Sequence, residues 1–314
     1  MKFRTLLLAC LCFFPVAGTV YSDALPDTIA IAPYGNSITQ AASNRQSYRY
    51  PLWKKLIDAN IAFDFVGSMN TNFGGNPSRP DYKGKAFDMD HEGHWGWRAD
   101  EILRDMATWL TRYTPDMVLL HIGTNDCIQG QNKDTTLNEI RQVVGKLRND
   151  NATVVIFLAN LIPCNSASAN VNNLNTGIRP LATQLNTASS PVIFVDQNSG
   201  INPQSDLYDG IHPGPTGEEK MAQKWFDAIN AYLSTTRVQR NVVYRGSGCP
   251  AAGPACRLDL VLPQTSPQGN AALPTAGFIT NLLGKRIVNA TGAINKTSGV
   301  YIISQPGQSD NTIR

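Results

Sequence analysis

The chain carries little charge and no long apolar run. Only 16% of its 314 residues are charged, and the formal net charge is +3. That charge falls to +1 without residues 1–22, which contain Lys2 and Arg4 but no acidic residue. A nearly neutral chain has no electrostatic footprint for nucleic acid or for an anionic membrane, so neither is an expected partner. The apolar run at 5–14 is too short to span a bilayer.

That short apolar run has another interpretation. It follows the two basic residues and precedes Val20-Tyr21-Ser22, a tolerable cleavage site. This order is typical of a secretory signal peptide. We therefore expect residues 1–22 to be removed and the mature chain to be extracellular.

Cysteines are also few. Four remain after the expected signal peptide, namely Cys127, Cys164, Cys249 and Cys256. Their spacing matches no zinc motif, and an even number in a secreted chain suggests two disulfides.

Apolar runs and helical patterns alternate along most of the chain. The runs lie near 28–33, 61–67, 116–122, 153–160 and 192–196, and the helical patterns near 47–59, 98–113, 134–149, 171–187 and 216–233. This alternation predicts an α/β fold of three layers, a doubly wound parallel five-stranded sheet with helices on both faces. We expect the flavodoxin-like strand order 2-1-3-4-5.

The strand order leads to a disulfide pairing. Cys127 and Cys164 would follow neighbouring strands, so we expect them to pair with each other. Cys249 and Cys256 are separated by a turn-rich stretch and are expected to pair locally.

The alternation lapses after about residue 236. Pro and Gly cluster at 246–256, and 263–269 reads as a linker. Short β-type runs follow within 277–303. We divide the chain into a main domain at 23–236, a linker with a local disulfide at 237–274 and a small β-rich tail at 275–314.

Chemistry-bearing residues follow the predicted strands. Ser37 comes directly after the first apolar run, where open α/β sheets place their reactive groups. No glycine stands two residues after it, so the segment is not a G-x-S-x-G elbow. His212 can serve as the base that activates the serine hydroxyl, and Asp209 can orient the imidazole from the same loop.

Acyl transfer also needs donors for a developing oxyanion. The amide of Ser37, the amide of Gly67 after the second strand and the side-chain amide of Asn125 after the third would supply three. The sequence thus contains a nucleophile, a base, an orienting carboxylate and an oxyanion hole.

With these blocks the chain resembles the SGNH (GDSL-like) hydrolases, whose four signature residues would be Ser37, Gly67, Asn125 and His212. Residues 64–68 and 90–97 look more narrowly like the family-three carbohydrate esterases, which are acetylxylan esterases. The resemblance runs from about residue 29 to about residue 225. It implies the SGNH hydrolase fold for the main domain and no cofactor. Asn36 stands where that family usually has aspartate, and asparagine keeps the acceptor capacity.

The segment 68–97 is too long and aperiodic to be a plain connection, and such loops are usually functional. His91 and His94 invite a zinc interpretation, but they lie three apart beside glycines and not at i and i+4. We expect no metal and assign His94 to the pocket wall. Trp95 and Trp97 are candidates to stack on sugar rings, although Trp95 could equally plug the loop into the core.

We therefore expect a monomeric secreted serine esterase that deacetylates a plant cell-wall polysaccharide, with acetylated xylan in first place. One alternative is a lipid or lysophospholipid esterase, which would want an apolar acyl groove that the polar loop 68–97 does not suggest. The other is a non-catalytic carbohydrate-binding protein on the same fold, against which the intact catalytic set argues.

Overall fold

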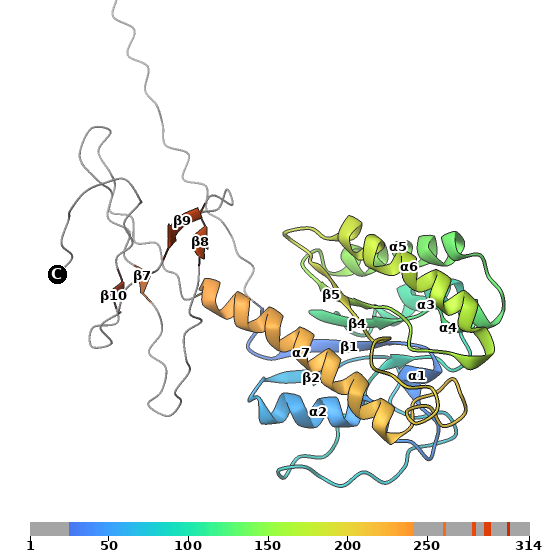
Figure 1. The fold of residues 1–314 in the computed structure, drawn as a ribbon. Helices are drawn as coiled ribbons and strands as arrows, with labels where there is room; N and C mark the ends of the chain where they lie inside the picture. The colour runs from blue at the N-terminus through green and yellow to red at the C-terminus, as the bar shows by residue number, and fades with distance from the viewer. Residues whose placement is uncertain (1–24, 241–259, 262–277, 281–285, 290–299, 302–314) are drawn as a thin grey trace, which may run out of the picture.

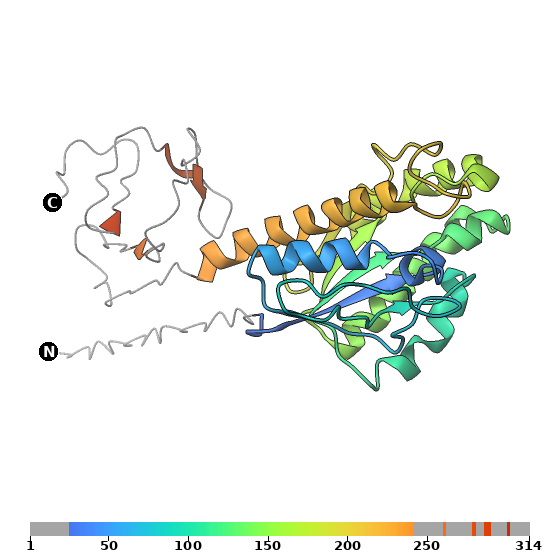
Figure 2. The ribbon, with the colours of Figure 1, turned by 90° about the horizontal axis from the view of Figure 1, so that it is seen from below.

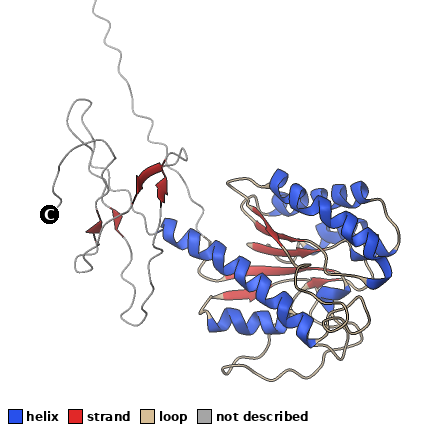
Figure 3. Cartoon of the chain, viewed as in Figure 1, coloured by secondary structure: helices blue, strands red, loops and turns tan. Residues whose placement is uncertain are grey.

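The computed structural model describes residues 25–240, with side chains to residue 236, and four short segments at 260–261, 278–280, 286–289 and 300–301. Residues 25–240 form a sheet enclosed between two layers of helices (Figures 1 and 3). The expected three-layer α/β fold is confirmed.

A parallel sheet forms the centre of the domain. Its main strands are β1 (Ile29–Gly35), β2 (Phe63–Phe65), β4 (Met117–His121), β5 (Val155–Ala159) and β6 (Val192–Val195). They pair in the order β2-β1-β4-β5-β6, all parallel, which is the predicted order. Because β1 and β4 are the central neighbours, the segments that follow them meet at the carboxyl edge of the sheet.

Helices cover both faces of this sheet. One face carries α3 (Ala99–Trp109), α5 (Lys133–Asp150) and α6 (Ser168–Leu185), and the other carries α2 (Arg49–Asp58) and α7 (Pro215–Arg240). The strands are apolar on both sides because alternate residues serve the two cores. Along β4, Val118 packs in the first core and Met117 in the second.

The sheet has one strand more than predicted. Residues Glu92–Gly93 of the long loop form β3, which pairs with Tyr34–Gly35 at the end of β1. It continues along β1 beyond the point where β2 stops. A two-residue strand has no periodicity that a sequence pattern could reveal.

Three short elements were also absent from the sequence expectation. They are α1 (Ser37–Gln40), α4 (Thr124–Ile128) and the 3₁₀ turn η1 (Asn165–Ala167). The helices α1 and α4 begin within three residues of the ends of β1 and β4, and both lie at the carboxyl edge of the sheet.

The expected disulfide between Cys127 and Cys164 is absent, which corrects the prediction. In the described part of the chain both are free thiols, and both are buried. The sulfur of Cys164 lies 3.3 Å from the hydroxyl of Ser166. Neighbouring strands do bring the two segments together, but Cys127 sits within the helix α4 and not in a free strand extension. Cys249 and Cys256 lie outside the described residues.

The carboxyl-terminal segments form two antiparallel strand pairs. Leu260–Val261 (β7) pairs with Val300–Tyr301 (β10), and Phe278–Thr280 (β8) pairs with Arg286–Asn289 (β9). The proposed boundaries at 236 and 274 stay predictions. None of the described helices combines the length and the hydropathy of a membrane span.

Candidate active site

Ser37 opens the helix α1 directly behind β1. The side chain of Asn36 accepts a hydrogen bond from the amide of Ile38 at 3.1 Å and so caps this helix. The acceptor role expected of the family's aspartate therefore survives. The turn needs Gly35, because a Cβ there would lie 2.2 Å from Thr39 Oγ1 and 2.9 Å from the carbonyl oxygen of His121.

The structure brings Ser37, His212 and Asp209 together. The Oγ atom of Ser37 lies 2.9 Å from Nε2 of His212, and Nδ1 of His212 lies 2.7 Å from Oδ2 of Asp209. The main-chain amides of Ile211 and His212 also donate to the Asp209 carboxylate, at 3.0 and 2.8 Å. Partial burial raises the pKa of Asp209, but these hydrogen bonds outweigh it and the net shift is downward.

The predicted oxyanion donor Asn125 lies in the first turn of α4. Its Nδ2 atom donates one hydrogen to the carbonyl oxygen of Trp97 at 2.8 Å. A side-chain amide has two hydrogens, so this bond fixes the direction of the second. The neighbouring Asp126 accepts from the amide of Ala99 with both oxygens, at 3.2 Å each, and thereby ties α4 to the start of α3. Burial raises the pKa of Asp126 to about 6.

Gly67, the predicted amide donor, follows β2 and packs against main chain. A Cβ on Gly67 would lie 2.1 Å from the carbonyl carbon and oxygen of His91. Only glycine allows this approach between the end of β2 and the start of β3.

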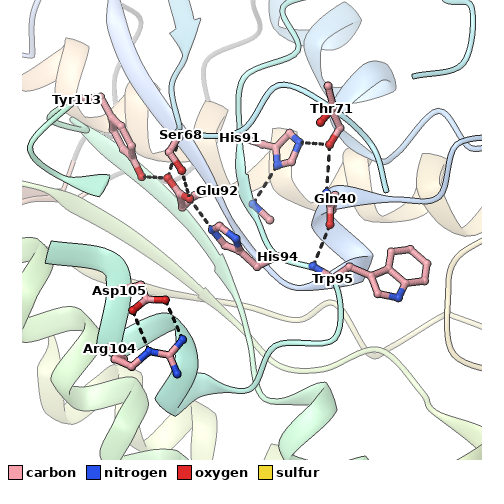
Figure 4. Close-up of polar contacts among 11 residues, drawn as sticks. Gln40, Ser68, Thr71, His91, Glu92, His94, Trp95, Arg104, Asp105 and Tyr113 are labelled. Atoms are coloured by element: carbon pink, nitrogen blue, oxygen red, sulfur yellow. Dashed lines mark hydrogen bonds and ion pairs between the residues drawn. The ribbon is translucent and has the colours of Figure 1, made fainter. Parts of the chain in front are cut away.

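A buried carboxylate fixes the same segment. Glu92 is fully buried and accepts hydrogen bonds from the amide of Ser68 at 2.8 Å, its hydroxyl at 2.7 Å and the Tyr113 hydroxyl at 2.6 Å (Figure 4). Its Oε1 atom also lies 2.5 Å from Nε2 of His94. Because Ser68 follows Gly67, Glu92 sets the position of the proposed oxyanion donor. Burial raises the pKa of Tyr113, so its hydroxyl stays protonated and donates.

His94 is buried among aromatic rings, whereas Trp97 is partly exposed. The ring of His94 stacks on Trp97 and on Trp109, with centroids 4.7 and 4.1 Å apart, and the histidine is only 8% exposed. Their packing supports the loop. His91 is fully buried, and burial lowers its pKa well below the ordinary value, so it is neutral. No three potential ligands among the described residues cluster to hold a metal ion.

Trp95 lies beside the triad. Its ring is parallel within 15° to that of His212, with centroids 4.8 Å apart, and within 20° to that of Phe73, with centroids 4.6 Å apart. The ring expected to stack on a sugar is thus engaged by two protein rings. Tyr208 also lies near the imidazole, at 5.7 Å and 19°. Tyr208 directly precedes Asp209 in the sequence, and this position was the signal that could have identified it as a residue of the site.

Arg49 joins the serine turn to the long loop. Its guanidinium donates to the carbonyl oxygens of Thr39 at 3.0 Å, Gln40 at 3.3 Å and Met89 at 2.7 Å, and to Oδ1 of Asn72 at 3.2 Å. The side chain is buried, and burial lowers its pKa to about 9. Nothing in the sequence around an arginine at the start of a helix indicated this role.

A small pocket opens beside the nucleophile. Its walls include Ser37, Ala41, Arg45, His212 and Glu218. Glu218 is nearly buried and accepts from the amide of Ser47 at 3.0 Å. Burial raises its pKa to about 7, although nearby arginines act in the opposite direction.

The comparison with protein families decides the membership. The model of the GDSL-like lipase/acylhydrolase family matches residues 34–220. The chain belongs to this family. The match spans every residue of the proposed site, from Ser37 to His212. It places this part of the chain among the GDSL-like lipases and acylhydrolases.

Among curated proteins, this GDSL-like hydrolase is similar to a multidomain esterase of Ruminococcus flavefaciens. The two are 29% identical over 251 residues, which is 74% of this chain and 32% of that protein. The chain therefore spans about a third of the length of that relative.

Solved structures of esterases are also similar to this chain. An acetyl esterase variant with a bound acetate ion is 29% identical, with a TM-score of 0.60 over 66% of this chain and 99% of that one. A carbohydrate esterase of family 3 from Talaromyces cellulolyticus is 30% identical, with a TM-score of 0.59 over 66% and 99%. A family 3 carbohydrate esterase from Clostridium thermocellum is 30% identical, with a TM-score of 0.55 over 66% and 98%.

Proposed function

We propose that this GDSL-like hydrolase removes acetyl groups from an extracellular polysaccharide, with acetylated xylan as the first substrate to test. The observation that carries the proposal is the line of contacts from Ser37 Oγ to His212 Nε2, 2.9 Å, and from His212 Nδ1 to Asp209, 2.7 Å. A serine hydroxyl needs a base at this distance, and the base needs an acceptor on its other nitrogen.

In the first half-reaction Ser37 Oγ forms a bond to the acetyl carbonyl carbon while its proton passes to Nε2 of His212. The carbonyl π electrons move to the oxygen, and the second hydrogen of the Asn125 amide, with the amides of Ser37 and Gly67, stabilises that oxyanion. When the tetrahedral intermediate collapses, the bond to the sugar oxygen breaks. The proton on His212 goes to that oxygen, which leaves as a free hydroxyl.

The second half-reaction repeats these roles with water. His212 takes a proton from the water, whose oxygen attacks the acetyl carbon of the acyl-enzyme. Collapse of the second intermediate breaks the bond to Ser37 Oγ, and the proton returns from His212 to that oxygen. Acetic acid leaves and ionises, and the enzyme is restored without a cofactor.

Two observations support an acetyl group on a carbohydrate. The pocket beside Ser37 is small, and Ile38, Ala41 and Ala42 form the apolar part of its lining. Two of the solved relatives, at 30% identity and nearly full coverage of their chains, are carbohydrate esterases of family 3. A long acyl chain would need an apolar groove, and only Phe73, Met89, Ile128 and Tyr208 are exposed large apolar residues in the described part of the chain.

Acetate release from acetylated xylan, measured beside hydrolysis of an octanoyl ester, tests the proposal. We expect kcat/KM on acetyl esters to exceed that on octanoyl esters by about 100-fold or more, on the order of 3 kcal/mol. Ser37→Ala should abolish both activities. Comparable rates on the two esters would overturn the carbohydrate assignment, and activity in Ser37→Ala would overturn the mechanism.

A further inference from the structure

The proposed base is packed against an indole. The ring of Trp95 lies 4.8 Å from that of His212, centroid to centroid, with the planes 15° apart. Stacking at this distance and angle places the π electrons of the indole against the imidazole. Trp is the aromatic side chain that binds a cation best.

Trp95 is held in place by the same helix that carries the nucleophile. Its amide donates to Oε1 of Gln40 at 2.9 Å, and Nε2 of Gln40 donates to the carbonyl oxygen of Thr71 at 3.2 Å (Figure 4). Gln40 is the last residue of α1, which begins at Ser37, and it is only 5% exposed. Trp95 therefore keeps its position relative to both Ser37 and His212.

The carboxylate of Asp209 supplies only part of the stabilisation that the protonated imidazole of His212 needs. The side chain of Asp209 is 40% exposed, whereas that of His212 is 13% exposed. Water and salt screen an exposed carboxylate, so its attraction for a cation on the imidazole is modest. The indole is stacked on the less exposed ring, so water and salt screen its attraction for a cation on that ring less.

We propose that Trp95 is a positioning residue for ester hydrolysis, whose indole holds the imidazole of His212 in line with Ser37 and stabilises the positive charge that this ring gains in each transition state. The charge exists only while His212 holds the proton of Ser37 or of water. The contact is therefore stronger in the transition state than in the resting enzyme, and it acts on kcat more than on KM. Gln40 and Phe73 support the indole.

The sharpest test replaces Trp95 site-specifically with indoles that carry one to four fluorine atoms. Fluorine withdraws density from the π system and changes the shape little, so kcat on p-nitrophenyl acetate should fall stepwise, by about 3- to 30-fold over the series. KM should stay within about twofold. If the indole only fills space, kcat will be the same for all the fluorinated variants, and that result would overturn the proposal.

Replacement of Trp95 by other natural amino acids provides a second test. We expect Trp95→Phe to lose about 3- to 10-fold in kcat and Trp95→Leu about 10- to 30-fold, with a folded protein by circular dichroism. Trp53→Phe is the control and should keep the wild-type rate, because the Trp53 ring packs on Tyr50, Tyr82 and Phe87 and not on His212. A rise in KM at unchanged kcat would make Trp95 part of the substrate pocket and would overturn the proposal.

The role of Trp95 rests on the proposed roles of Ser37 and His212. Different results would overturn the esterase mechanism and the role of Trp95. Full activity in His212→Ala would overturn the esterase mechanism itself. Loss of activity in His212→Ala combined with a flat fluorine series would leave that mechanism intact and remove only the role of Trp95.

Discussion

The side-chain amide of Asn125 donates to the main-chain oxygen of Trp97 at 2.8 Å. One of its hydrogens is thereby held by the segment that leads into α3, and the other is left for a ligand. The long loop 68–97 and the helix α4 are coupled at this point, so the geometry of the proposed oxyanion hole depends on both.

Asn125→Ala should lower kcat on p-nitrophenyl acetate by about 100- to 1,000-fold, because one oxyanion donor is lost in the transition state. KM should change little, and steady-state kinetics separate the two parameters. An unchanged kcat with a raised KM would place Asn125 in the substrate pocket.

We expect the Gly67→Ala variant to unfold at a lower temperature than the wild type and to lose its ester hydrolysis. The new Cβ would lie 2.1 Å from the main chain of His91, so the end of β2 must move; overpacking of this kind costs about 1–3 kcal/mol. Thermal unfolding and ester hydrolysis measure the two effects. Gly145→Ala in α5 is the matched control, because nothing lies within 4 Å of its Cβ and alanine favours a helix by about 0.5–1 kcal/mol. A wild-type rate in Gly67→Ala would remove Gly67 from the oxyanion hole.

Glu92→Gln tests whether the buried carboxylate positions Ser68 and, through it, Gly67. Glutamine keeps the shape but offers one oxygen in place of two, so the Ser68 or the Tyr113 donor loses its partner, at about 1–3 kcal/mol per group. We expect a lower midpoint in urea together with a lower kcat. Tyr113→Phe removes one of these bonds but keeps both bonds from Ser68, the neighbour of Gly67, and should affect stability more than rate. The reverse pattern would contradict the positioning role.

Glu218 gives the stability a pH dependence. Its pKa is raised from 4.5 to about 7 by burial, so the folded protein binds this proton more tightly than the unfolded chain does. The stabilising contribution of Glu218 to the free energy of unfolding is therefore fully present below about pH 4.5, and it is lost as the pH rises through about 7. The free energy of unfolding of Glu218→Gln, minus that of the wild type, should grow over this interval by at most about 3 kcal/mol.

Urea unfolding between pH 4 and 8 measures this difference. Glu219→Gln serves as the control for the loss of one carboxylate, because its side chain is 54% exposed and contacts Lys55. A difference between Glu218→Gln and wild type that stays constant with pH would contradict the assignment.

Cys127 and Cys164 should resist alkylation in the folded protein. They are 4% and 1% exposed, and burial raises the pKa of Cys127 to about 12, so thiolate is scarce at neutral pH. Mass spectrometry after iodoacetamide treatment should find both modified only in denaturant, without reductant. A crosslinked peptide that contains both cysteines would restore the disulfide expected from the strand order.

The sequence predicted the parts that depend on strand order. Ser37 and His212 each follow a strand or its loop, and parallel strands bring their carboxyl ends to one edge, so the contact between them could be foreseen. Gly67 and Asn125 also follow strands, and their role as oxyanion donors stays a prediction. The predicted sheet order therefore carried most of the site with it.

The supporting contacts could not be foreseen in this way. Glu92 reaches Ser68 and Tyr113 from a strand of two residues, which is too short to show a pattern. Arg49 contacts main-chain oxygens, whose positions no residue type reveals. The cysteine pairing failed because adjacency of strands does not fix the direction of a thiol inside a helical turn.

The direction of α7 has a practical consequence. This helix of 26 residues begins at Pro215, three residues after His212, and runs back along the sheet to Arg240. Figures 1 and 2 both show its last turn at the end of the domain where β1 begins, away from α1 and the serine. A surface or fusion partner attached there would hold the enzyme with its catalytic edge facing outward. We therefore expect immobilisation through the last turn of α7 to leave the catalytic edge accessible to a polymeric substrate.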